Sequence, residues 1–144
     1  MIEYSIFKIK SETYKQELML RDKILRKPLG MSLFEEDLSQ DKHDIHIGAF
    51  DDNVLVGVIL LSTNDESIIK MRQVAVDNEF QGRGIGSAMV KFSEKYAIEN
   101  GFKKMTMHAR KTAIQFYDKL GYETIGEEFI EVSLPHFKMD KNLK

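Results

Sequence analysis

The sequence contains no cysteine, only two prolines and no long hydrophobic run. The absence of cysteine excludes a disulfide framework, a thiolate-ligated metal site and a covalent mechanism through a cysteine nucleophile. The longest apolar stretch, Val54 to Leu61, is interrupted by Gly57 and is far shorter than the roughly 20 residues of a membrane span. The first ten residues are too short and too charged for a signal peptide. We therefore expect a cytoplasmic protein without a membrane partner.

Charge of neither sign dominates: 21 basic side chains stand against 23 acidic ones, and the formal net charge is −2. This balance gives no electrostatic reason to bind nucleic acid. The 144 residues are enough for one hydrophobic core, and they contain no internal repeat or low-complexity segment. We expect residues 1–144 to form a single domain. No spacing of histidines and carboxylates resembles a metal motif, so no metal is expected.

The hydrophobic pattern alternates between the periods of strands and helices. Strands are expected at 2–10, 45–50, 54–62, 67–76, 103–109, 122–125 and 129–139, and helices at 11–26, 84–100 and 112–120. The predicted order is therefore β-α-β-β-β-α-β-α-β-β. That order indicates an α/β protein of the α+β kind, with a mixed central sheet flanked by helices rather than a doubly wound parallel sheet.

Three glycines at alternate positions follow the strand expected at 67–76, in the sequence Gln81-Gly82-Arg83-Gly84-Ile85-Gly86. Without a Cβ, such a backbone can adopt positive φ and approach a ligand closely. The helix that follows directs its free N–H groups to the same place, which favours a phosphate or pyrophosphate. The spacing fits neither a dinucleotide-binding fingerprint, which needs a glycine where Ser87 stands, nor a P-loop. From the pattern alone, a glycine-rich turn without a ligand is the alternative.

With its neighbours, this loop resembles the acetyl-CoA pyrophosphate loop of the GCN5-related N-acetyltransferase (GNAT) family. The segment Arg72 to Asp77 resembles the fourth strand of that family, and Ala113 to Tyr122 resembles its second motif, a helix with Phe-Tyr that ends in Leu-Gly-Tyr. The resemblance covers about residues 45–139. Two further segments, 25–30 and 135–139, are similar to a subgroup of small bacterial members with unassigned acceptors. The resemblance implies the GNAT fold and an acetyl-CoA-dependent N-acetyltransferase.

The resemblance also implies where acetyl-CoA, the acetyl donor, binds. The pantetheine arm is expected along Val74, Ala75 and Val76 like an added strand, which requires the strand at 103–109 to splay away. The pyrophosphate is expected on the backbone of Gln81, Gly82, Arg83, Gly84, Ile85, Gly86 and Ser87. Arg110 stands where the family frequently has an asparagine that contacts pantetheine. This departure puts that contact in doubt, and an arginine there is expected to reach a CoA phosphate instead.

Acetyl transfer to an amine requires that the amine lose a proton and that the departing thiolate gain one. The resemblance implies Tyr117 as the acid, whereas helical spacing alone would make Tyr117 a core residue. The base is open among His46, His108, His136, Glu128 and Glu131. Since no cysteine can carry the acetyl group, direct transfer in a ternary complex is the expected mechanism.

The acceptor is expected to be an amine of a small molecule or peptide, with His46, Arg72 and His136 on its side of the site. A local acidic run is either a solvated loop or an attractant for a cationic amine: Glu35, Glu36, Asp37, Asp41 and Asp44. The alternative to an enzyme is a non-catalytic CoA-binding sensor or scaffold, and a weaker alternative is another acyl donor or an oxygen acceptor. Whether the chain forms a homodimer is open.

Overall fold

The computed structural model describes residues 1–144, whose strands form one mixed seven-stranded sheet in the order β1-β2-β3-β4-β5-β7-β6. The strands are β1 Ile2–Phe7, β2 Ile45–Asp51, β3 Val54–Ser62, β4 Ile68–Val76, β5 Lys104–Arg110, β6 Glu123–Glu131 and β7 Leu134–Asn142. The helices are α1 Glu12–Leu25, α2 Ile85–Glu99 and α3 Ile114–Lys119. Short 3-10 turns lie at 27–29, 33–35, 39–43, 78–80 and 111–113. The predicted order of strands and helices and the mixed sheet are confirmed.

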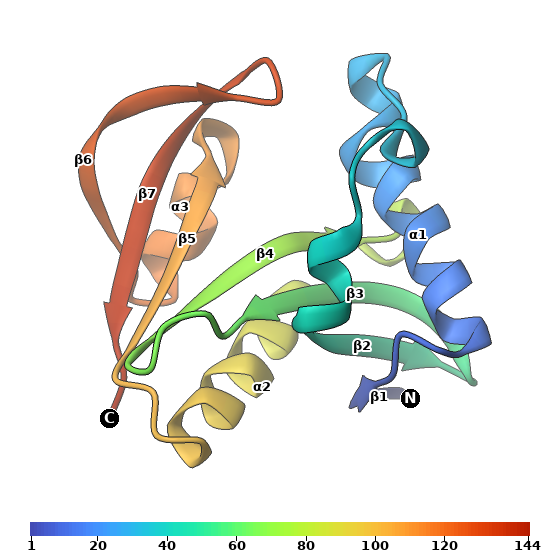
Figure 1. Cartoon of the computed structure of the whole chain (residues 1–144), viewed down its shortest axis with the longest axis horizontal. Coiled ribbons are helices and arrows are strands. Elements are labelled where there is room, and N and C mark those ends of the chain that lie inside the picture. The colour runs from blue at the N-terminus through green and yellow to red at the C-terminus, as the bar shows by residue number, and fades with distance from the viewer.

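The helices cover both faces of this sheet (Figure 1). The larger core cluster joins residues of α2 and α3, such as Met89 and Tyr117, to one face of the strands. A smaller cluster joins Leu20 of α1 to Val58, Leu60 and Ala75 on the opposite face. The central strand β3 is buried from Leu55 to Ser62, as expected of an uninterrupted apolar strand covered on both sides.

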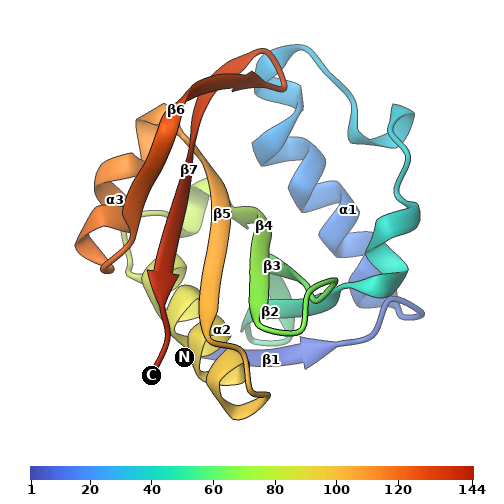
Figure 2. The ribbon, with the colours of Figure 1, turned by 60° about the vertical axis from the view of Figure 1, so that its left-hand side comes forward.

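The only parallel pair in the sheet, β4 with β5, is short. Its register runs from Ile68 opposite Lys104 to Met71 opposite Met107 and then stops, although both strands continue. Beyond that point β5, β7 and β6 turn away from β4 (Figures 1 and 2). The predicted splay between these two strands is therefore confirmed.

A β-bulge in β4 lies at the point where the strands part. Arg72 pairs with Leu60 of β3 and Ala75 pairs with Val58, so β4 contains one residue more than its partner over this stretch. Gln73 takes up the extra length with a positive φ of 55°, which is uncommon for a residue with a side chain. Such a bulge bends its strand, and this one follows directly on Met71, the last residue of β4 that pairs with β5.

The predicted boundaries of the two closing strands are wrong. The predicted strands leave residues 126–128 between them, but β6 continues through these residues with an irregular register between Ile125 and Phe129. Gly126 has a φ of 79° and serves a bulge there. The hairpin turn is at Val132 and Ser133, both with positive φ, which a sequence rule based on glycine or asparagine does not detect. The first strand likewise ends at Phe7 rather than Lys10.

None of the helices has the length and the apolar content that crossing a membrane would require.

Candidate active site

A cleft of about 610 Å³ lies between the diverging ends of β4 and β5. Its walls are β4, the glycine loop, β5, α3, the end of α1 and the turn between β6 and β7. The predicted site residues that line it are Arg72, Val74, Ala75, Val76, Gln81, Gly82, Gly84, Ile85, Gly86, Ser87, Arg110, Tyr117 and His136. Arg83 and His46 do not line it. Such a volume is ordinary for a small-ligand site.

The glycine loop has the conformation that its composition predicts. Gly82 and Gly84 have φ values of 79° and 78°, and a Cβ added at either would meet no other atom within 4 Å. The loop is anchored by Gln81, whose Nε2 donates to the carbonyl of Val76 at 3.0 Å. Gly84 is the N-cap of α2, so the free N–H groups of that helix face this open space. The backbone can thus bind an anion without any side chain in the way.

The inner edge of β4 is free on the side of the cleft. Val74, Ala75 and Val76 have no partner on β5, because the pairing ends at Met71. An unpaired strand edge offers a row of backbone donors and acceptors to an extended ligand. The edge leads directly into the glycine loop, so one elongated molecule can use both.

Tyr117 points its ring into the core and lines the cleft. The side chain is 6% exposed, packs edge-on against Phe116 and Tyr122, and makes no hydrogen bond within the protein. Burial raises the pKa of Tyr117 above its ordinary value. The hydroxyl therefore keeps its proton at neutral pH and lacks an acceptor.

Glu131 lies between two imidazoles at the other side of the cleft. The Nδ1–H of His108 donates to Glu131 Oε1 at 2.9 Å, and Nε2 of His136 is 3.8 Å from Oε2. The Nδ1–H of His136 donates to the carbonyl of Leu134 at 2.8 Å. The carboxylate thus fixes the His108 ring with its Nε2 unbonded, an orientation suited to accepting a proton.

The side chains of β5 alternate between the two faces of the sheet, so the residues of β5 that line the cleft lie on different faces. Met107 and Ala109 are buried in the core cluster that contains Tyr117, whereas His108 and Arg110 project from the opposite face. Arg110 reaches the end of α1, where its Nη2 donates to the carbonyl of Leu25 at 3.0 Å. The cleft therefore has one wall on the side of α2 and α3 and another on the side of α1.

His46 lies inside the protein, so the expected contact with an acceptor is not consistent with its position. It is 2% exposed, its Nδ1 faces Glu17 Oε1 at 2.5 Å, and its Nε2 faces the carbonyl of Asp41 at 2.7 Å. Arg21 bonds Glu17, Asp41 and the side chain of Gln73, and Arg72 pairs with Asp44. This buried ion cluster, formed by Glu17, Arg21, Asp41, Asp44, His46 and Arg72, is electrically balanced when His46 is charged.

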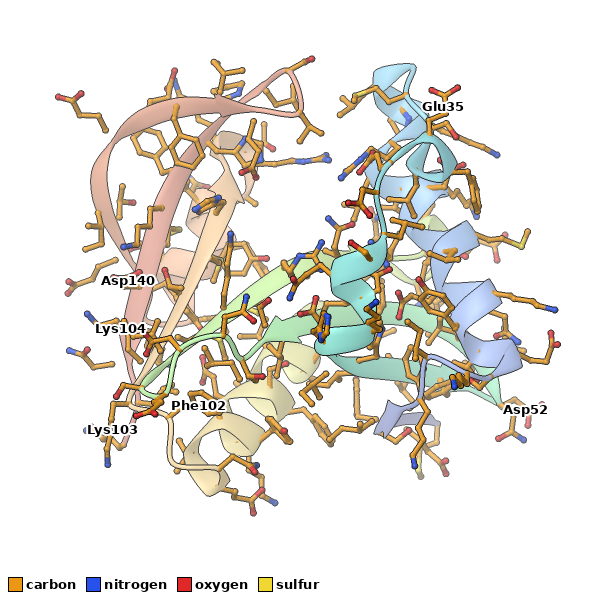
Figure 3. All side chains as sticks on the ribbon, in the orientation of Figure 1. Glu35, Asp52, Phe102, Lys103, Lys104 and Asp140 are labelled. Carbon is orange, nitrogen blue, oxygen red and sulfur yellow. The ribbon has the colours of Figure 1, made fainter.

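The acidic run does not face the cleft, and none of its five residues lines it. Asp41 and Asp44 belong to the buried ion cluster, and Glu36 pairs with Arg26 at 2.5 Å. Glu35 lies at the outer end of its loop (Figure 3). The expectation that this run attracts a cationic amine into the site therefore has no support. The pairing of Glu36, Asp41 and Asp44 with arginines outside the run could not be predicted from local charge.

The structure contains no group of three or more histidine, aspartate or glutamate side chains placed to hold a metal ion.

A split sheet with a glycine loop at the free strand edge defines an acyl-CoA N-acyltransferase fold. Residues 11–143 match the family model described as an acetyltransferase (GNAT) domain, and the chain belongs to the GNAT family. The family model thus classes the protein with the GNAT acetyltransferases.

One curated protein and two solved structures illustrate what this chain is similar to. An uncharacterized N-acetyltransferase of Bacillus subtilis, YjcF, is 26% identical over 132 residues, which are 91% of this chain and 94% of the relative. The crystal structure of Escherichia coli ElaA has a TM-score of 0.83 at 21% identity, covering 98% of this chain and 99% of that one. A GNAT family acetyltransferase from Elizabethkingia anophelis, solved with acetyl-CoA bound, has a TM-score of 0.75 at 16% identity and covers 99% and 98%.

The buried ion cluster predicts a pH-dependent stability. Burial by itself lowers the pKa of His46, but the hydrogen bond and charge of Glu17 outweigh it, so the pKa is raised above 6.5. A group whose pKa is higher in the folded state stabilises the protein at pH values below its unfolded pKa, and this contribution is lost as the pH rises through the folded pKa. The urea midpoint of the wild type should therefore fall as the pH rises above about 6.5.

His46→Gln should remove this dependence and lower the midpoint at pH 6. His43→Gln is the matched control, because His43 lies in the adjacent turn and makes no side-chain hydrogen bond or ion pair. Parallel midpoint curves for the wild type and His46→Gln across this pH range would contradict a charged His46.

Proposed function

We propose that the protein transfers the acetyl group of acetyl-CoA directly to the amine of a small molecule or peptide in a ternary complex. The observation that carries this proposal is that one cleft places an unbonded tyrosine hydroxyl and a carboxylate-oriented imidazole on opposite walls. A proton donor and a proton acceptor on two sides of a gap suit a reaction in which one proton leaves and another is taken up. No cysteine is present to carry the acetyl group between two separate steps.

Acetyl-CoA is proposed to bind along the free edge of β4, with the pyrophosphate on the loop from Gln81 to Ser87. The open space beside Gly84 and the N-terminus of α2 support this position. Arg83 stacks over Phe80 at 4.9 Å and lies outside the cleft, so its contribution is proposed to be its backbone N–H.

In the proposed reaction, the amine nitrogen attacks the carbonyl carbon of the thioester. A C–N bond forms, the C–S bond breaks, and the Tyr117 hydroxyl donates its proton to the departing thiolate. The Nε2 of His108 accepts the proton that the amine loses, and Glu131 is a positioning residue that holds this imidazole. His108 is preferred to His136 because the His136 ring is almost fully buried.

A non-catalytic CoA-binding sensor is the second candidate, since such a protein would need the loop and the strand edge alone. Binding of CoA alone would not require the oriented His108 or the unbonded Tyr117 hydroxyl. The cytoplasmic location and the single domain stay predictions, and whether the chain forms a homodimer stays open.

Gly84→Ala should weaken CoA binding at least tenfold, because the Cβ of the alanine would occupy the space proposed for the pyrophosphate. The size of the effect follows from the hydrogen bonds that would be lost, since those to a charged group contribute about 1.5–3 kcal/mol each. Gly101→Ala is the matched control: Gly101 also has positive φ and open space around it, but it lies at the other end of α2. Titration calorimetry with CoA measures both. Equal affinities of the two variants would refute the assignment of the loop.

Tyr117→Phe should reduce kcat by roughly 10² to 10⁴, the usual effect of losing a positioned acid. Because the hydroxyl makes no hydrogen bond in the protein, CoA affinity and thermal stability should hardly change. Tyr122→Phe is the contrasting control, since its hydroxyl donates to Glu94 at 2.8 Å and lies outside the cleft. That variant should lose stability and keep kcat. A fully active Tyr117→Phe enzyme would show that the acid lies elsewhere.

The loss of kcat caused by His108→Gln should depend on how basic the acceptor amine is. An alkylamine is almost wholly protonated at pH 7.5, so loss of the base should lower its kcat by about 10² or more. Hydroxylamine is largely unprotonated at this pH and should be acetylated by the variant almost as fast as by the wild type. Thiol release measures both rates. Equal losses with the two amines would mean that His108 does not act as a base.

A further inference from the structure

Two guanidinium groups converge on the α1 wall of the cleft. The carbonyl of Leu25 accepts a hydrogen bond from Arg26 Nη1 at 3.1 Å and another from Arg110 Nη2 at 3.0 Å. Two like charges on one oxygen are held there because Leu25 is the last residue of α1, whose C-terminal end carries a partial negative charge. Both arginines line the cleft.

Only one carboxylate compensates these two charges. Glu36 bonds Arg26 through both of its oxygens, at 2.5 and 3.3 Å. Arg110 has no ion pair, and its contact with Leu25 is its one hydrogen bond, so most of its five N–H donors are unused. The pKa of Arg110 is lowered by burial and by the positive charge of Arg26, in accord with a half-buried cation that lacks a counter-charge.

The rest of the cleft does not supply the missing negative charge. Its remaining charged residues are Arg72, which pairs with Asp44, and Glu131, which bonds His108. The acidic side chains of the loop between α1 and β2 are outside it. Of the three arginines that line the cleft, only Arg110 lacks a carboxylate partner, and this unpaired charge favours an anionic ligand on the wall where Arg110 lies.

An anion bound by Arg110 would lie on the opposite face of the sheet from the proposed pyrophosphate site. Arg110 projects from β5 to the α1 side, whereas the glycine loop begins α2, which packs on the other face of the sheet. His108 is two residues before Arg110 and projects from the same face. Their Cα atoms are therefore about 7 Å apart along the strand.

We propose that the acceptor is a small amine that also carries a carboxylate or phosphate group, with the anion bound by Arg110 and the amine directed to His108. This inference rests on the proposed function, since it concerns the acceptor of the same reaction. The short distance between the two residues fits an acceptor in which a few bonds separate the amine from the anion. A polyamine or a simple alkylamine would place no negative charge at Arg110.

Two matched pairs of amines test the proposal: phosphoethanolamine against ethanolamine, and β-alanine against propylamine. Binding to the CoA-saturated protein is measured by calorimetry, and acetylation is measured by thiol release with acetyl-CoA. The anionic member of at least one pair should bind at least tenfold more tightly and show a correspondingly lower KM. Equal binding and equal KM within both pairs would overturn the proposal.

The variant Arg110→Gln tests whether Arg110 binds the anionic group of the acceptor or a phosphate of CoA. Glutamine is chosen because it keeps a hydrogen-bond donor for the carbonyl of Leu25. In Arg110→Gln the preference for the anionic amine should disappear, whereas the Kd of CoA should stay within twofold of the wild-type value. Arg110→Lys should retain part of the preference. Lys111→Gln is the control for the loss of one positive charge, since Lys111 pairs with Glu128 outside the cleft. It should behave as the wild type. A tenfold weaker CoA affinity with the anion preference intact would assign Arg110 to CoA and refute the proposal.

The outcomes also separate this inference from the proposed function. If the CoA complex binds the anionic amines preferentially but releases no thiol with any amine, the anion site stands and the enzymatic proposal fails. If ethanolamine and propylamine are acetylated as well as their anionic partners, the enzymatic proposal stands and the anion site is refuted.

Discussion

The early end of the pairing between β4 and β5 is the constraint on which the rest of the site depends. Two parallel strands that separate after Met71 and Met107 leave both inner edges without partners. Unpaired backbone groups inside a protein are costly, so such a gap persists only where a ligand or solvent reaches them. The bulge at Gln73 belongs to the same constraint, because it bends β4 at the point where its partner leaves. The glycine loop then begins where the free edge ends.

The buried ion cluster contacts β4 at this bulge. Arg21 joins Glu17 and Asp41 to the side chain of Gln73, the residue with positive φ, and Arg72 beside it is tied to Asp44. Five of the six charged groups of the cluster are buried, and Arg72 is partly exposed. Burying charges carries a large desolvation cost, and a well-packed apolar cluster of the same volume would often be as stable. Directed hydrogen bonds fix an orientation that apolar contacts do not. The hydrogen bond of Arg21 to Gln73 and the ion pair of Arg72 with Asp44 thus orient two consecutive residues of the bulge.

The fold could be predicted largely from the sequence because its signals are local. Strand and helix periods gave the order of the elements, and the glycine spacing located the loop. The turn at Val132 and Ser133 was missed because neither residue favours positive φ by itself. Gln73 and Arg26 were missed for another reason: their roles depend on Arg21 and Glu36, which tertiary packing brings to them. The same holds for Glu36, Asp41 and Asp44 of the acidic run, whose arginine partners lie outside it. No local rule detects such compensation.

The two faces of the sheet divide the chemistry between them. Alternation along β5 directs Met107 and Ala109 to the core that surrounds Tyr117, and it directs His108 and Arg110 to the opposite side. In an intact sheet these two sets of side chains would never meet, because the hydrogen-bonded backbone lies between them. Where β4 and β5 part, the sheet is open, and a group on one face can reach a group bound on the other. A thioester held on the α2 and α3 side would thus be exposed to an amine from the α1 side. Because both reactants are then present at once, the acetyl group needs no covalent carrier, in accord with a chain that contains no cysteine.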